Sequence, residues 1–251
     1  MRVELAPALI LHRRAWRDTS VLVEAFAREH GRIGLLAKGA RRPKSRWQGV
    51  LEPLTGLALS WTGRGELHTL TDVDAPRRYR LSGHALMGGF YASELIMRLL
   101  ARDDPHPPLY DSLIALLDGL DAGAPAIVAL RFFERDLLDV LGYGISLEAT
   151  SDDDTAVVAG GRYLYHPDTG LRQARGAPGP GEVEIAGDAL RGLAAGRFDS
   201  RADVRAARDL MQAAIAPHLG GRPLKSVATL QAMQQFAAGT DTQRTARGDP
   251  T

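Results

Sequence analysis

Short apolar runs alternate with polar breaks over the first eighty residues, which is the pattern of β-strands joined by turns. Turn-forming segments such as Arg17-Asp18, His30-Gly31 and Gly63-Arg64-Gly65 separate these runs. Five short strands in a stretch of this length favour a small closed barrel such as an OB-fold, with an SH3-like barrel as the alternative. The predicted strands are Ala8–Arg13, Ser20–Ala27, Arg32–Gly39, Pro53–Thr62 and Glu66–Asp74.

From Leu81 onward the apolar residues recur with the period of helices. The prolines of DDPHPP, residues 103–108, end the first predicted helix, and Gly142 ends the third. Ser200 is placed to cap a later one. The predicted helices are His84–Ala101, Pro108–Leu120, Pro125–Gly142, Gly187–Ala195, Ser200–Leu219 and Val227–Ala238.

Residues 143–183 interrupt the helices, because they hold few helix signals. The stretch VVAGGRYLYHP, residues 157–167, is typical of a hairpin, and GAPGPG, residues 176–181, is typical of a linker. We expect the terminal residues 239–251 to be disordered. The fold class that follows is a multidomain α+β protein, with a five-stranded OB-fold barrel followed by an all-α domain that carries a small hairpin insertion.

The two predicted domains differ in charge. Residues 1–80, the barrel, contain 15 Lys and Arg against 8 Asp and Glu, a net charge of +7. Residues 81–251, the helical domain, hold the remaining 16 and 22, a net charge of −6. The total of +1 therefore hides a basic half, which indicates an anionic partner for the barrel.

The absence of cysteine excludes disulfides, thiolate zinc sites and a cysteine nucleophile. The early apolar run Ala6–Leu11 is too short for a signal sequence, and no run approaches the roughly 20 apolar residues of a membrane helix. We expect a cytoplasmic protein with no membrane contact.

The segment KGARRPKSRW, residues 38–47, concentrates positive charge. No carboxylate lies between Glu29 and Glu52, so nothing within that window screens these cations. A charged loop is often only a solvated connection. However, HRRAWR, residues 12–17, is a second basic stretch with an aromatic residue, and cations combined with aromatics are what single-strand binding by a small barrel requires. The predicted nucleic-acid-binding residues are Arg13, Arg14, Lys38, Arg41, Arg42, Lys44 and Arg46. Trp16 and Trp47 are either stacking platforms or partly buried core residues.

Four stretches in order resemble the RecO family of bacterial DNA-repair proteins, from about Leu9 to Phe236. They are GRIGLLAKGARRPKSRW, LEPLTGLALSW, LRFFERDLLDVLGYG and HLGGRPLKS. The resemblance implies an N-terminal OB domain and a C-terminal helical domain. It also implies a recombination mediator associated with the nucleoid, which binds single- and double-stranded DNA and anneals complementary strands. With the partner RecR, the family helps to load RecA onto strands coated by the single-strand-binding protein SSB, and its members bind the acidic tail of SSB.

One departure from the family concerns metal. Many relatives carry a four-cysteine zinc site after the block that here reads LGYGISLEATSDDD, and this chain has no cysteine. Asp152, Asp153, Asp154 and His166 lack the spacing of a calcium loop. We predict no structural metal, no cofactor, and a hairpin over Arg162–His166 that holds by packing alone.

The sequence offers no catalytic arrangement. Glu134 and Asp136 are two residues apart on a predicted helix and face different directions, so a structural role is favoured, in which Glu134 pairs with Arg131 or forms a salt bridge with a neighbour. The seven histidines are scattered, without a metal-binding motif. We predict a protein that is not an enzyme. Two rivals stay open: an RNA-binding OB-fold protein of translation or RNA processing, and a hydrolase or transferase that uses Asp152–Asp154.

The motif LGGRPLKS, residues 219–226, has a structural explanation for most of its residues. Gly220-Gly221 can end a helix, Pro223 turns the chain, and Ser226 can cap the next helix. Arg222 and Lys225 are left unexplained. Two cations beside a helix start can receive an acidic peptide, so we predict that they bind the SSB tail.

Overall fold

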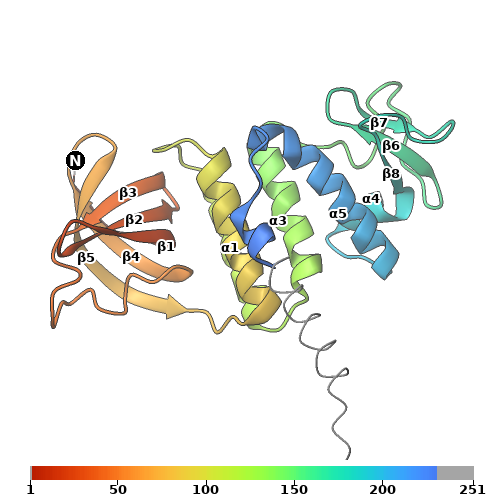
Figure 1. Cartoon of the computed structure of the whole chain (residues 1–251). Helices are drawn as coiled ribbons and strands as arrows, with labels where there is room; N and C mark the ends of the chain where they lie inside the picture. The colour runs from red at the N-terminus through yellow and green to blue at the C-terminus, as the bar shows by residue number, and fades with distance from the viewer. Residues whose placement is uncertain (1, 231–251) are drawn as a thin grey trace, which may run out of the picture.

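A closed five-stranded barrel forms the N-terminal part of the computed structural model, which describes residues 2–230 (Figure 1). The strand order is β1-β2-β3-β5-β4, and β4 pairs with β1 to close the ring. The β3–β5 pair is parallel and the other pairs are antiparallel. This order and closure agree with the predicted OB-fold. The strands are β1 Arg2–Trp16, β2 Ser20–Ala27, β3 Gly31–Ala37, β4 Thr55–Thr62 and β5 Leu67–Arg78.

Strand β1 is longer than the predicted Ala8–Arg13 because it pairs with two partners in succession. Its first half, from Arg2, pairs with β4, and its second half, to Trp16, pairs with β2. The centre of the strand is buried on both faces. Ile10 lies in the barrel core, whereas Leu9 and Leu11 belong to the core of the helical domain. Successive side chains of a strand point to opposite faces, so one apolar run supplies two cores.

The helical domain begins directly after the barrel, and five of its six predicted helices are confirmed within the described residues. Ser200 caps α5 as expected, since its hydroxyl accepts the backbone N–H of Asp203. A 3₁₀ turn, Ala216–Leu219, completes the predicted helix Ser200–Leu219. Residues 225–230 are helical, and the rest of the predicted helix Val227–Ala238 lies outside the described residues, as does the tail 239–251. The helices are α1 Gly83–Leu99, α2 Pro107–Asp121, α3 Ala126–Val140, α4 Gly187–Ala195 and α5 Arg201–Ile215. None of the helices among the described residues has the length and apolar character needed to cross a membrane.

The insertion is a three-stranded sheet rather than the predicted two-stranded hairpin. It has the order β7-β6-β8, with β6 Arg162–His166, β7 Gly170–Gln173 and β8 Val183–Ala186. The four-residue β8 follows a Gly- and Pro-rich segment, which masks it in the sequence pattern. The expectation that packing alone holds this sheet is also incomplete. Arg162 pairs with Glu184 at 2.8 Å and Arg172 with Glu182 at 2.6 Å, in addition to buried apolar side chains such as Tyr163.

The barrel is fastened to the helices by ion pairs and by one close backbone approach. Arg28 pairs with Asp111 of α2 at 2.7 Å, and Arg102, just after α1, pairs with Glu24 of β2. Gly31 has a φ of +69°, and a Cβ there would overlap the backbone of Asp104. The barrel, the helices and the small sheet lie in a row (Figure 1). The basic loop, residues 38–54, belongs to the barrel.

Candidate nucleic-acid interface

The loop 38–54, between β3 and β4, folds as a chain of turns with its apolar residues inward. Backbone hydrogen bonds join Arg42 to Gly39 and Ser45 to Arg42, each at 3.1 Å. Trp47 and Leu51 enter the barrel core, and these anchors leave the cationic side chains facing solvent. The loop is therefore an ordered platform for positive charge. Its exposed cations are Lys38, Arg41, Arg42, Lys44 and Arg46.

The basic loop lies beside the turn between β1 and β2. The Arg41 backbone N–H donates to the Thr19 carbonyl at 2.8 Å, and the Arg41 guanidinium donates to the Arg17 carbonyl at 3.2 Å. This contact follows from topology, because β2 pairs with both β1 and β3, so the end of β3 meets the start of β2. The two basic stretches of the sequence are thus brought together. Arg17, exposed in this turn, was not among the predicted binding residues, although it ends the HRRAWR stretch.

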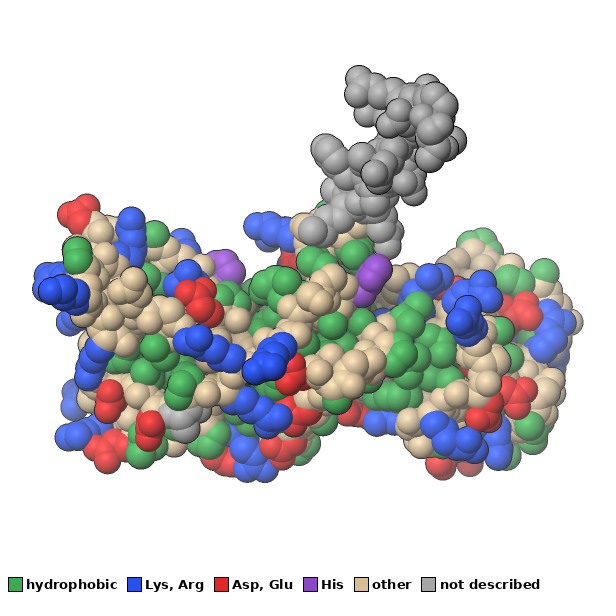
Figure 2. Space-filling view, turned by 90° about the horizontal axis from the view of Figure 1, so that it is seen from below, with side chains coloured by type: hydrophobic (Ala, Val, Ile, Leu, Met, Phe, Trp, Pro, Cys, Tyr) green, Lys and Arg blue, Asp and Glu red, His purple; other side chains and the backbone are tan. Residues whose placement is uncertain are grey.

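The seven predicted cations divide into two groups by their partners. Arg13 pairs with Glu52 at 2.9 Å and Arg46 pairs with Asp72 at 3.3 Å, so their charges are partly satisfied within the protein. Within residues 2–230, the others form no ion pair: Arg14, Lys38, Arg41, Arg42 and Lys44. Figure 2 shows Lys and Arg side chains on the end of the barrel farthest from the helices, with Asp and Glu side chains among them.

The two tryptophans near the cations have different environments. Trp47 is 6% exposed, belongs to the barrel core and lies under Arg46, whose guanidinium carbon is 4.2 Å from the ring centroid. Trp16 is half-buried, with the guanidinium carbons of Arg14 and Arg17 at 5.7 and 6.0 Å from its ring centroid. Trp47 is therefore a core residue, and Trp16 is the aromatic that remains available for stacking beside the cations.

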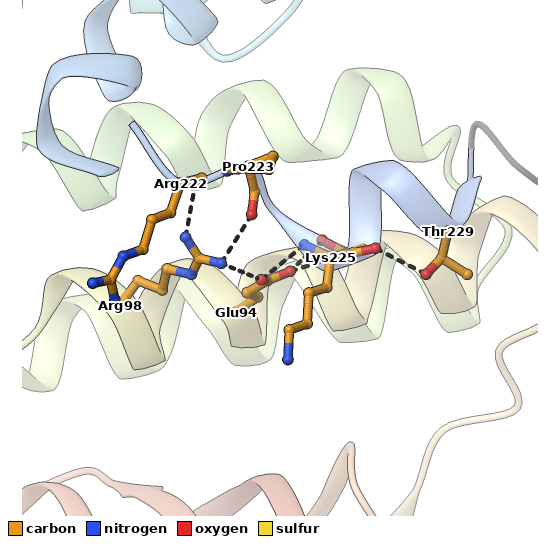
Figure 3. Close-up of polar contacts among 7 residues, drawn as sticks. Glu94, Arg98, Arg222, Pro223, Lys225 and Thr229 are labelled. Atoms are coloured by element: carbon orange, nitrogen blue, oxygen red, sulfur yellow. Dashed lines mark hydrogen bonds and ion pairs between the residues drawn. The ribbon is translucent and has the colours of Figure 1, made fainter. Parts of the chain in front are cut away.

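The LGGRPLKS motif is held against α1 by two residues that the sequence reasoning did not select (Figure 3). Glu94 accepts the backbone N–H groups of Lys225 and Ser226, each at 2.9 Å, and the Ser226 hydroxyl at 2.8 Å. The Arg98 guanidinium donates to the carbonyls of Arg222 and Pro223, each at 2.9 Å. The prediction that Ser226 caps this helix is therefore wrong. The carboxylate of Glu94, on α1, caps the helix instead.

The Glu94 carboxylate is stabilised in its charged form. Burial alone would raise its pKa, but hydrogen bonds from Ser226 and Lys225 and the positive charge of Arg98 lower the pKa below its ordinary value. The side chain of Lys225 extends away from Glu94, and Arg222 lies beside Arg98 (Figure 3). Neither cation forms an ion pair within the described part of the chain. Their role in binding a partner stays a prediction.

A groove of about 650 Å³ borders Ser226 of this motif and lies among α1, α3, α5 and residues 226–230. Its wall is mainly apolar, with Met87, Ile127 and Leu230 among the lining side chains. Arg131 and Arg208 also line the groove. The sequence patterns did not predict this groove, because its residues come from segments far apart in the chain.

The acidic residues of the insertion form a turn. The Asp153 carboxylate accepts the Thr150 hydroxyl at 2.6 Å and the Thr155 backbone N–H at 3.2 Å, and these hydrogen bonds lower its pKa. Among residues 2–230, no three His, Asp or Glu side chains are grouped as metal ligands would be. The predicted Arg131–Glu134 ion pair is confirmed at 2.8 Å.

Two family models together cover the chain almost from end to end. Recombination protein O N terminal matches residues 1–79, and Recombination protein O C terminal matches residues 80–228. The chain belongs to the RecO family. The chain is 48% identical to a DNA repair protein RecO of Halorhodospira halophila over 88% of its own length and 93% of that protein. RecO proteins of Alkalilimnicola ehrlichii and Ralstonia nicotianae are 42% and 37% identical, over 90% and 94% of this chain and 90% and 86% of theirs. The RecO family assigns the chain to DNA repair and recombination.

Proposed function

We propose that this RecO-family protein is a non-enzymatic recombination mediator that acts at the nucleoid and binds single- and double-stranded DNA through its barrel. The observation that carries this proposal is the contact between the basic loop and the β1–β2 turn, which joins the unpaired cations of the loop to the basic stretch that holds Arg14, Trp16 and Arg17. Phosphates would meet Arg14, Lys38, Arg41, Arg42 and Lys44. Arg13 and Arg46 would join them by exchanging exposed carboxylate partners for phosphates.

Strand annealing follows from the same surface. Two complementary strands repel each other through their phosphates, and a protein that neutralises phosphates lowers the cost of bringing the strands together. Trp16 would stack on a base, a contact worth about 1–3 kcal/mol.

The test compares DNA with RNA. Equal-length DNA and RNA strands are titrated with the full chain at several salt concentrations, and annealing of complementary DNA strands is followed by fluorescence. We expect DNA binding and annealing, both weakened by Trp16→Ala. A strong preference for RNA would replace the DNA proposal with an RNA-binding function.

We further propose that the acidic tail of SSB binds the groove of the helical domain. An apolar residue at the end of the tail would enter among Met87, Ile127 and Leu230, and its terminal carboxylate would meet Arg131. Ser226 lines the groove, and Arg222 and Lys225 precede it closely in the chain. These two cations would contact acidic residues further along the tail. SSB would thereby bring the cationic barrel to the DNA strands that SSB already coats.

A synthetic SSB-tail peptide tests this part. We expect binding that is lost when the last apolar residues are removed, and weakened by Arg131→Gln. Arg222→Gln with Lys225→Gln should weaken binding less and make it less dependent on salt, since both cations are exposed. Binding unaffected by Arg131→Gln would place the tail elsewhere. Recruitment of RecR and loading of RecA onto SSB-coated strands are tested with the purified partners.

A further inference from the structure

A buried polar triad lies behind one wall of the groove. Glu134 of α3 is fully buried, and one of its carboxylate oxygens accepts two hydrogen bonds. The Tyr91 hydroxyl of α1 donates to it at 2.7 Å, and the Arg131 guanidinium donates to it at 2.8 Å. Arg131 is 5% exposed and lines the groove, as Tyr91 does. The triad therefore joins a buried carboxylate to the wall of the proposed tail site.

The triad leaves polar atoms without partners. Among the described residues, Nε and Nη1 of Arg131 and Oε2 of Glu134 are buried and form no hydrogen bond. A buried donor or acceptor without a partner has lost its hydrogen bonds to water, so such groups are rare and call for an explanation. A guanidinium donates strong, charge-assisted hydrogen bonds to carboxylates. Arg131 lines the groove and keeps unpartnered N–H groups at Nε and Nη1, and a carboxylate that enters there would accept a hydrogen bond from one of them.

The charge on Glu134 decides how attractive Arg131 is to an anion. When Glu134 is ionised, the Arg131–Glu134 pair is neutral, and an incoming carboxylate meets a second anion behind the guanidinium. When Glu134 holds a proton, the positive charge of Arg131 is uncompensated. Burial raises the pKa of Glu134 to about 7, although the charge of Arg131 and the hydrogen bond from Tyr91 act to lower it. Both states of Glu134 are therefore accessible near neutral pH.

We propose that Glu134 and Tyr91 are positioning residues for Arg131, and that Glu134 takes up a proton when the carboxylate of an acidic peptide binds Arg131. This inference rests on the proposed tail site. Two other charged groups line the groove, His84 of α1 and Arg208 of α5. Arg208 pairs with Asp209 at 2.7 Å. The substitution His84→Gln tests whether His84 contributes to the pH dependence of binding.

The experiment titrates the full chain with the SSB-tail peptide between pH 6 and pH 8, with a free or an amidated C-terminus. Calorimetry in two buffers of different ionisation enthalpy counts the protons taken up. For a pKa of about 7, the protonated fraction of Glu134 falls from about 0.9 to about 0.1, so Kd for the free-acid peptide should weaken about tenfold. The amidated peptide should bind weakly and take up no proton.

Three variants separate the inference from the proposed function. Glu134→Gln, which mimics the protonated acid, should bind at pH 8 as tightly as the parent does at pH 6 and take up no proton. Tyr91→Phe removes a donor that favours the ionised form, so the midpoint of the pH dependence should move upward. His84→Gln should leave the tenfold change intact. Thermal unfolding checks that each variant is folded.

The outcomes are distinguishable. A tenfold change that persists in folded Glu134→Gln, or one that disappears in His84→Gln, would overturn the inference while leaving the tail site in place. An unmoved midpoint in Tyr91→Phe would remove Tyr91 from the proposal. Equal binding of the free and amidated peptides would instead overturn the carboxylate contact of the proposed tail site, and the inference with it.

Discussion

The unpaired cations of the basic loop give the most direct test of how the barrel meets DNA. We consider the replacement of Lys38, Arg41, Arg42 and Lys44 by Gln. All four side chains are exposed and lie outside the ion pairs of the described structure. On a single strand, each lost phosphate contact lowers the dependence of log K on log salt by about 0.7, so the slope should fall by about 3 units.

This change of slope is large enough to measure. A fourfold rise in salt, from about 50 to about 200 mM, should weaken the parent protein about 50-fold more than the variant. Fluorescence anisotropy with a labelled single strand at five or six salt concentrations gives both slopes. Thermal unfolding should be nearly unchanged, because exposed charges without ion-pair partners contribute little to stability.

The control must remove the same charge from a different surface. Arg175, Arg191, Arg201 and Arg205 are exposed, lie in the helical domain and form no ion pair among the described residues. Their replacement by Gln gives the same net charge as the loop variant but should leave the slope near that of the parent. An equal loss of slope in both variants would mean that total charge, not the loop, drives binding. An unchanged slope in a folded loop variant would refute the reasoning.

Three further predictions concern the fold. Glu94→Gln should destabilise the protein by about 1–3 kcal/mol at pH 7 in urea unfolding, because it disturbs the acceptor of two backbone N–H groups. Since the folded pKa of Glu94 is lowered, its contribution is present above the unfolded value of about 4.3 and is lost as the pH falls through the folded pKa, so the two proteins should converge in acid. Gly88→Ala should be more stable than Gly89→Ala by about 1 kcal/mol or more in thermal unfolding, because a Cβ at Gly88 meets ordinary contacts of 3.5 Å or longer, whereas one at Gly89 lies 2.8 Å from Leu54. Equal stabilities would contradict this. Ile185→Ala should cost about 2–5 kcal/mol in the same assay, because Ile185 is 1% exposed; a cost below about 1 kcal/mol would show that β8 is dispensable.

The elements with strong local signals could be predicted from the sequence. The period of the apolar residues distinguishes barrel from helices, and residues such as Ser200 and Gly142 mark helix ends through local hydrogen bonds or backbone conformation. The third strand β8 could not be predicted, because four residues beside a Gly- and Pro-rich segment give too short a pattern. Its identity as a strand depends on pairing with β6, which is a tertiary contact.

The candidate sites likewise have some features that the sequence shows and others that only the fold decides. The concentration of cations at residues 38–46, the absence of nearby carboxylates in the chain, and the RecO family motifs are properties of the sequence itself. Which cations are free was decided by the fold, because Asp72 reaches Arg46 from a distant strand and Glu52 folds back onto Arg13. The sequence pattern also left both tryptophans ambiguous, whereas packing buried Trp47 and left Trp16 half-exposed.

The sequence by itself determined the composition of the two halves, the helices and barrel strands with strong local patterns, and the family to which the chain belongs, because these depend on local order and on motifs. Only the tertiary structure placed Glu94 as the cap of a helix more than one hundred residues away, and set Tyr91 beside Arg131 and Glu134 behind the groove. A hydrogen bond between distant residues depends on how helices pack, and no local pattern records that packing.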